Sequence, residues 1–142
     1  PLLVTFVPML NDTGGNCGNQ SSTMVIRGLT TGDITTKDWL KVWWKEFRVS
    51  LLVSIVLASF NFIRIAFFTK APEGVNVYMI AISVSGALFL IVILAKSVGG
   101  LLPILAKKLK LDPAVMAAPL ITTLVDAAAI IIYFTFVSHL LF

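Results

Sequence analysis

The stretch PAVMAAPLITTLVDAAAIIIYFTFVSHLL, from Pro113 to Leu141, decides the fold, because it is long, apolar and interrupted by a single acid, Asp126. A helix of about 20 mostly apolar residues is enough to cross a bilayer. At a rise of 1.5 Å per residue, Asp126 would lie ~20 Å from the start of that helix, inside a hydrocarbon core about 30 Å thick. The stretch therefore predicts a membrane-spanning helix with one ionisable group at depth.

The composition of the whole chain indicates lipid as its main solvent. Its 142 residues are 58% hydrophobic and 13% charged, whereas soluble domains carry roughly 45–50% apolar and about 25% charged residues. A chain this short cannot hide so much apolar surface in a water-soluble core. We therefore expect three further spans, at residues 2–29, 49–68 and 77–95, the last of which can extend to Leu105. The prediction is an all-α polytopic transmembrane bundle of four membrane helices, forming one domain over residues 1–142.

The basic residues gather in two connections between the spans. The first connection holds Arg27, Lys37, Lys41, Lys45 and Arg48, and the second holds Lys96, Lys107, Lys108 and Lys110. Positively charged connections stay on the cytoplasmic side, so the net charge of +4 is interpreted as a topology signal and not as a nucleic-acid-binding surface. A multi-pass protein of the cell membrane follows, with its C-terminus outside. The chain starts at Pro1 without a basic leader, so we expect a fragment that lacks an upstream portion.

Smaller features add local expectations. Asp112 followed by Pro113 is typical of a helix N-cap with proline in the first turn. Glu46 and Glu73 are expected to be solvated, and Lys96 either buried or extended to the membrane surface.

Asp126 has two interpretations. A carboxylate that faces lipid costs several kcal/mol, so such residues face a bundle interior or a water-filled path. Asp126 is either an ion-binding group in a pore or a structural acid bonded to another helix. Thr122, four residues earlier, would lie on the same helix face.

The polar centre of the first span, NDTGGNCGNQSST (Asn11–Thr23), is the second place where chemistry is expected. Helical spacings of 4, 3 and 4 form a polar stripe beside Gly15, consisting of Asp12, Asn16, Asn19 and Thr23. Amide, hydroxyl and carbonyl oxygens are hard ligands that suit Mg²⁺ or Ca²⁺. The alternative is close helix packing through small residues at Gly14, Gly18 and Ser22, and both can hold on different faces.

The oxygen inventory favours Mg²⁺, because this ion keeps several of its waters and can be held through them by few charges. Three other functions stay open: an ion-coupled exchanger in which Asp126 changes protonation, an intramembrane hydrolase that pairs Asp12 with Asp126, and a structural membrane subunit. No further catalytic motif accompanies the two acids, so an enzyme is not expected.

Two long segments, PMLNDTGGNCGNQSSTMVIRGL (Pro8–Leu29) and LDPAVMAAPLITTLVDAAAIIIYF (Leu111–Phe134), resemble the MgtE magnesium channels. The resemblance covers essentially the whole chain, as transmembrane helices two to five of a five-helix domain. It implies a homodimeric Mg²⁺ channel with its pore at the dimer interface, regulated by upstream cytoplasmic magnesium-sensing domains that this chain lacks, together with the first membrane helix. It also implies pore positions at Asp126, Thr122, Gly15, Asn19 and Thr23. Ala118 stands where some members carry a polar residue near the cytoplasmic mouth.

Overall fold

The computed structural model describes residues 2–116 and 118–142, and the described chain is helical with short connections. The long helices are α1 (Val7–Thr31), α2 (Trp39–Phe68), α3 (Val77–Lys108) and α4 (Ala118–Leu140). Short 3₁₀ turns precede three of them: η1 (Leu3–Phe6), η2 (Thr36–Asp38) and η3 (Pro113–Met116). The predicted all-α helical bundle is confirmed.

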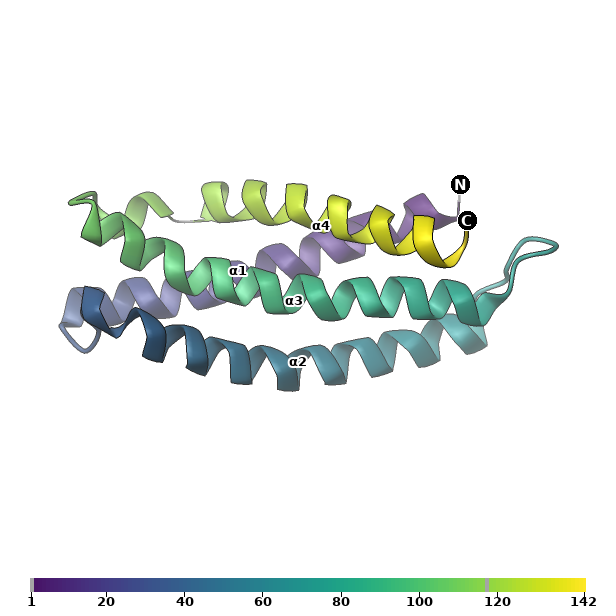
Figure 1. Ribbon diagram of the computed structural model, residues 1–142, viewed down its shortest axis with the longest axis horizontal. Helices are drawn as coiled ribbons and strands as arrows, with labels where there is room; N and C mark the ends of the chain where they lie inside the picture. The colour runs from purple at the N-terminus through teal and green to yellow at the C-terminus, as the bar shows by residue number, and fades with distance from the viewer. Residues whose placement is uncertain (1, 117) are drawn as a thin grey trace.

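The four long helices run alternately up and down, and α3 contacts each of the other three (Figure 1). Both termini and the α2–α3 connection lie at one end of the bundle, and the α1–α2 and α3–η3 connections lie at the other. The two lysine-rich connections therefore share one end, which we call the basic end. This arrangement is the one that the charge pattern predicted.

Small residues set the distance between α1 and its neighbours. Gly18 of α1 and Gly99 of α3 meet backbone to backbone, so that an added Cβ on Gly99 would overlap the Gly18 carbonyl. A Cβ on Gly14 would lie 2.8 Å from methyl groups of both Ile91 and Val125. Gly14 and Gly18, four residues apart, thus form a packing face on α1, because their small size lets the neighbouring helices approach closely.

The helix boundaries differ from the sequence expectation in three places. The second membrane helix begins at Trp39, ahead of the predicted Val49, because the Trp- and Lys-rich approach is itself helical. The third continues past Ala95 and Leu105 to Lys108, and Pro103 lies inside it. Asp112 does accept a hydrogen bond from the Ala114 N–H (3.0 Å), but it caps the turn η3, which is distinct from α4.

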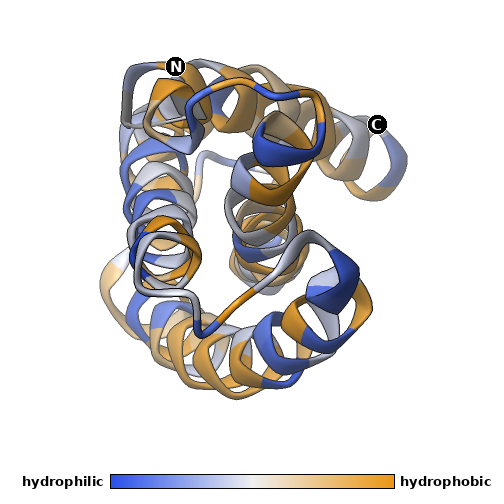
Figure 2. Ribbon diagram, turned by 90° about the vertical axis from the view of Figure 1, so that its left-hand side faces the viewer, coloured by the Kyte–Doolittle hydropathy of each residue, from blue (hydrophilic) through white to orange (hydrophobic). Residues whose placement is uncertain are grey.

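Three helical stretches of the described chain are long and apolar enough to cross a membrane, namely Thr36–Phe68, Val77–Lys108 and Pro119–Leu140. Seen from the basic end, hydrophilic residues concentrate in the connections and at the start of α2 (Figure 2). Helix α1 is too polar to qualify by composition, as its Asn- and Gly-rich centre predicted. It nevertheless runs from one end of the bundle to the other beside the three apolar helices.

Candidate functional site

A polar cavity of about 390 Å³ lies between α1 and α4. Its lining consists of Asn11, Asp12, Gly15, Asn16, Asn19, Thr122 and Asp126. Five of these residues come from one face of α1 and two from α4, so the cavity exists only because the packing face of α1 brings the two helices together. Asp12 and Asn16 are exposed, whereas Asn19, Thr122 and Asp126 are half-buried.

Three side-chain oxygens in this cavity are buried and have no hydrogen-bond partner: Asn11 Oδ1, Asn19 Oδ1 and Asp126 Oδ1. Buried polar atoms are nearly always hydrogen-bonded, because an unpaired one costs about 1–3 kcal/mol. No hydrogen bond to either oxygen of Asp126 is formed within the described chain, although the residue lies in the middle of an apolar helix. The cavity therefore presents acceptors that need a donor from outside the chain.

One hydrogen bond fixes the direction of the Asn19 amide. Its Nδ2 donates to Thr122 Oγ1 at 3.2 Å, so Oδ1 is left as the free atom. This contact joins α1 to α4, and it uses the Thr122 hydroxyl that sequence spacing placed one turn before Asp126. The consequence is a carbonyl oxygen held on the cavity wall by a partner on the opposite helix.

The other predicted positions are distributed unevenly. Asn16 Nδ2 donates to Asp12 Oδ2 at 3.4 Å, so this pair is joined at the exposed rim. Gly15 is buried in the cavity wall, and a Cβ added to it would lie 3.6 Å from Thr122 Cγ2. Thr23 is exposed and does not line the cavity. Ala118 is the first residue of α4, and its side chain lies outside the described residues.

Asn11 is the lining residue that sequence reasoning missed. It lies outside the Asp12–Thr23 stripe, but it precedes Gly15 by four residues, and Asn19 follows Gly15 by four more. Residues four apart share a helix face. The spacing Asn11–Gly15–Asn19 was therefore the signal that could have found it.

A second polar group lies inside the bundle, between α1, α2 and α3. Ser21 Oγ donates to Glu46 Oε2 at 2.6 Å, and Lys96 Nζ donates to Gln20 Oε1 at 3.3 Å and to Ser21 Oγ at 3.4 Å. Glu46 is only 7% exposed and Lys96 only 3%. The expectation that Glu46 is solvated was wrong, because its helix begins earlier than predicted and turns this side chain toward α1 and α3.

The cavity chemistry is that of oxygen acceptors. One carboxylate at depth, two amide carbonyls and a hydroxyl can accept hydrogen bonds from the waters of a hard cation. No group of three or more His, Cys, Asp or Glu side chains able to hold a metal occurs in the part of the chain that the structure describes. Asp12 and Asp126 share the cavity, but no hydrogen bond joins their carboxyl groups there.

The apolar bundle and its oxygen-lined cavity define a class, the polytopic membrane proteins with a polar cavity between helices. Comparison with known proteins gives the family: residues 7–136 match MgtE, described as divalent cation transporters, and the chain belongs to this family. It is 40% identical over 98% of its length to the magnesium transporter MgtE of Thermus thermophilus and 36% identical over 93% to that of Bacillus subtilis. The chain is thus part of a multi-pass membrane protein.

The chain spans less than a third of the length of these relatives, 29% of the Thermus protein and 28% of the Bacillus protein. The Enterococcus faecalis magnesium transporter MgtE, 29% identical over 96% of the chain, is matched over a similar share, 29%.

Proposed function

We propose that this chain forms the ion pathway of a homodimeric Mg²⁺ channel, in which Asp126 of each subunit holds the hydrated ion. One observation carries the proposal: Asp126 has a buried oxygen without a partner in a cavity shared with the orphaned Oδ1 of Asn19. The membership of the family and the names of its relatives supply Mg²⁺ as the transported ion.

The volume of the cavity is compatible with an ion that retains its water. Mg²⁺ takes an octahedral shell, and six waters at about 30 Å³ each fill roughly 180 Å³. The cavity of about 390 Å³ exceeds that volume. The ion can therefore be held through its waters, with Asn19, Asn11 and Asp126 as acceptors, and with Gly15, Thr122, Asp12 and Asn16 completing the wall.

A second copy of the chain gives the site its charge balance. The cavity is open on the side of the exposed residues Asp12 and Asn16, so a two-fold axis beside it would bring two Asp126 carboxylates to one path. Two like charges in a low-dielectric site repel each other strongly, and a divalent cation between them removes that repulsion. Thr23 and Ala118 would then lie along the same path toward the basic end.

We also propose the orientation. The basic end faces the cytoplasm, as positively charged connections do, and the C-terminus lies outside. The sensing of cytoplasmic Mg²⁺ is assigned to segments beyond this chain, in keeping with the greater length of the relatives.

The test is Mg²⁺ flux through the full natural protein in liposomes, followed with an entrapped Mg²⁺ dye. Asp126→Asn keeps the shape and removes the charge, and we expect flux to fall by about tenfold or more, the scale on which charge concentrates counter-ions in a path. Asp33→Asn, the same change at an exposed site of the basic end, is the matched control and should keep wild-type flux. Unchanged flux in Asp126→Asn would refute the role of this carboxylate.

The driving force distinguishes a channel from an exchanger. Flux through a channel follows the Mg²⁺ electrochemical gradient alone, and its rate should not change when proton and sodium gradients are removed. Flux that stops without a proton gradient would replace the channel with a proton-coupled exchanger that uses the same carboxylate.

A further inference from the structure

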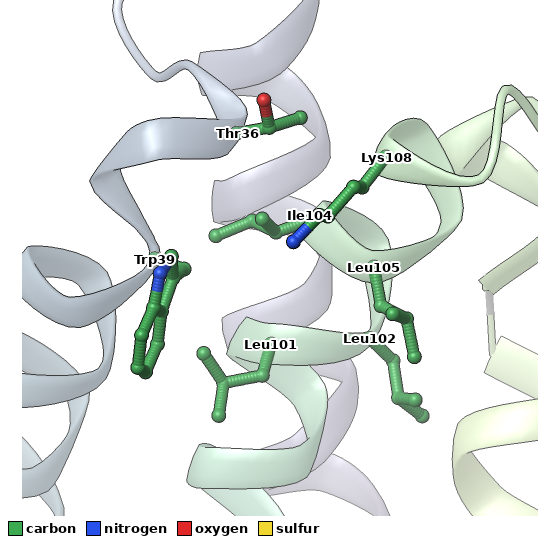
Figure 3. A pocket seen from close by; sticks show the side chains of 7 residues that line it. All are labelled: Thr36, Trp39, Leu101, Leu102, Ile104, Leu105 and Lys108. Carbon is green, nitrogen blue, oxygen red and sulfur yellow. The ribbon is translucent and has the colours of Figure 1, made fainter.

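A second cavity lies at the basic end, and none of its lining residues belongs to the cavity between α1 and α4 (Figure 3). This groove has a volume of about 280 Å³ and lies between η2, the start of α2 and the last turns of α3. Its lining is apolar at Trp39, Leu101, Leu102, Ile104 and Leu105, and polar at Thr36 and Lys108. Neither Asn19 nor Asp126 contributes to it.

The apolar part of the groove is accessible from outside. Trp39 is 51% exposed and Leu105 is 47% exposed, whereas Ile104 is buried beneath them. These residues belong to two helical stretches that are apolar enough to span a membrane. In a bilayer, the solvent at this groove is the acyl chain of a lipid, and the volume of the groove accommodates a part of one chain.

The polar rim of the groove offers hydrogen-bond donors, namely the ammonium of Lys108 and the hydroxyl of Thr36, which can also accept. Figure 3 shows the Lys108 ammonium directed into the space between α3 and Trp39, with Thr36 above. Within the described chain, the Lys108 ammonium, the Thr36 hydroxyl and the Trp39 indole N–H form no hydrogen bond or ion pair. The Lys108 ammonium can only donate, so a ligand at this position supplies acceptors, as a phosphate group does.

The charge around the rim is positive in sum, because five lysines stand against three nearby acids, Asp33, Asp38 and Asp112. Asp38 Oδ2 accepts from the Thr35 backbone N–H at 3.0 Å and from its hydroxyl at 3.1 Å. Asp33 Oδ2 accepts from the Thr31 hydroxyl at 3.0 Å. Among the described residues, no carboxylate lines the groove, while Lys37 of η2, Lys41 of α2, Lys107 of α3 and Lys110 lie close to its lining residues in the sequence.

We propose that this groove binds one acidic phospholipid, with an acyl chain along Trp39, Leu101 and Leu105 and the headgroup phosphate on Lys108 and Thr36. Basic pockets between membrane helices at the polar boundary take acidic headgroups, and amphipathic Trp side chains belong at the same depth. The apolar walls favour a lipid over a free anion, and the net positive charge favours an acidic lipid over a zwitterionic one. The proposal is independent of the assignment of the ion pathway.

The experiment is native mass spectrometry of the full natural protein in detergent, equilibrated with equal amounts of dioleoyl phosphatidylglycerol and dioleoyl phosphatidylcholine. The two lipids share their acyl chains and differ in headgroup charge. We expect the wild type to retain the acidic lipid preferentially, and Lys108→Gln to lose about fivefold of that preference, since one basic residue near an acidic membrane surface contributes about 1 kcal/mol. Lys110→Gln removes the same charge two residues away, outside the groove, and should keep the preference.

Four results would overturn the proposal. Equal retention of both lipids by the wild type would remove the selectivity, and an equal loss in Lys108→Gln and Lys110→Gln would show a diffuse surface charge. Displacement of the lipid by glycerol 3-phosphate at the same concentration would show a free-anion site. Failure of the wild type to retain any lipid would mean that a protein segment outside this chain covers the groove.

Discussion

Replacing Gly99 by alanine tests the closest contact in the bundle. The added Cβ would overlap the backbone carbonyl of Gly18, and neither backbone can move without separating α1 from α3. Gly18 is itself enclosed, since a Cβ on it would lie 2.8 Å from Ile121 Cγ2 and 3.3 Å from the Ala95 carbonyl oxygen. The rotation of a side chain cannot remove this overlap, so the two helices must move apart.

The size of the effect follows from two opposing terms. Overpacking of a well-packed contact costs about 1–3 kcal/mol. Alanine is favoured over glycine in a helix by about 1 kcal/mol, which offsets part of that cost. The net expectation for Gly99→Ala is a loss of about 0–2 kcal/mol in the free energy of unfolding.

Gly100→Ala is the matched control, because it lies next on the same helix and gains the same helix propensity. Its Cβ would meet Glu46 Cγ at 3.1 Å and Val42 Cγ1 at 3.7 Å, which are side-chain atoms that can adjust. Denaturant unfolding in mild detergent, followed by tryptophan fluorescence, should place Gly99→Ala below Gly100→Ala by about 1–3 kcal/mol. Equal stability of the two variants would refute the backbone contact between α1 and α3.

Two further substitutions test single hydrogen bonds by the same unfolding assay. Tyr133→Phe removes the bond from its hydroxyl to the Leu3 carbonyl (2.6 Å) and should cost about 1 kcal/mol, whereas Tyr78→Phe, at an exposed tyrosine, should cost nothing measurable. Ser21→Ala removes the donor to the buried Glu46 carboxylate (2.6 Å) and should cost about 1.5–3 kcal/mol. A loss near zero for Ser21→Ala would mean that water replaces the hydroxyl at this carboxylate.

The sequence predicted the parts of the fold that depend on periodicity. The number of long helices, their alternation and the polar interior of the first follow from apolar run lengths and from residues three and four apart. The two faces of α1 also followed, since Gly14 and Gly18 lie in the packing contact while Asp12, Asn16 and Asn19 lie along the cavity. These features are local, so a single sequence contains them.

The features that the sequence did not predict depend on contacts between helices. The charge of Glu46 suggested solvent, and only the packing of α2 against α1 and α3 shows that its carboxylate is buried and bonded to Ser21, which Lys96 contacts in turn. The start of α2 was placed too late because Trp and Lys residues mark a membrane boundary without ending a helix. Thr23 is exposed and lies outside the cavity for a similar reason. The point along α1 at which α4 stops covering the polar stripe is set by the packing of the two helices, and a single sequence does not contain it.

The polar centre of α1 has a consequence for how the protein enters its membrane. This helix leaves the ribosome before α2, α3 and α4, yet it is the one long helix of the described chain that lacks the hydropathy to partition into lipid by itself. The surfaces that enclose its packing face, around Gly99 of α3 and Val125 of α4, are synthesised later. Stable integration of α1 therefore depends on helices that are made after it, so the insertion of these four helices is cooperative, and the most hydrophilic of them is secured only when the later ones are in place.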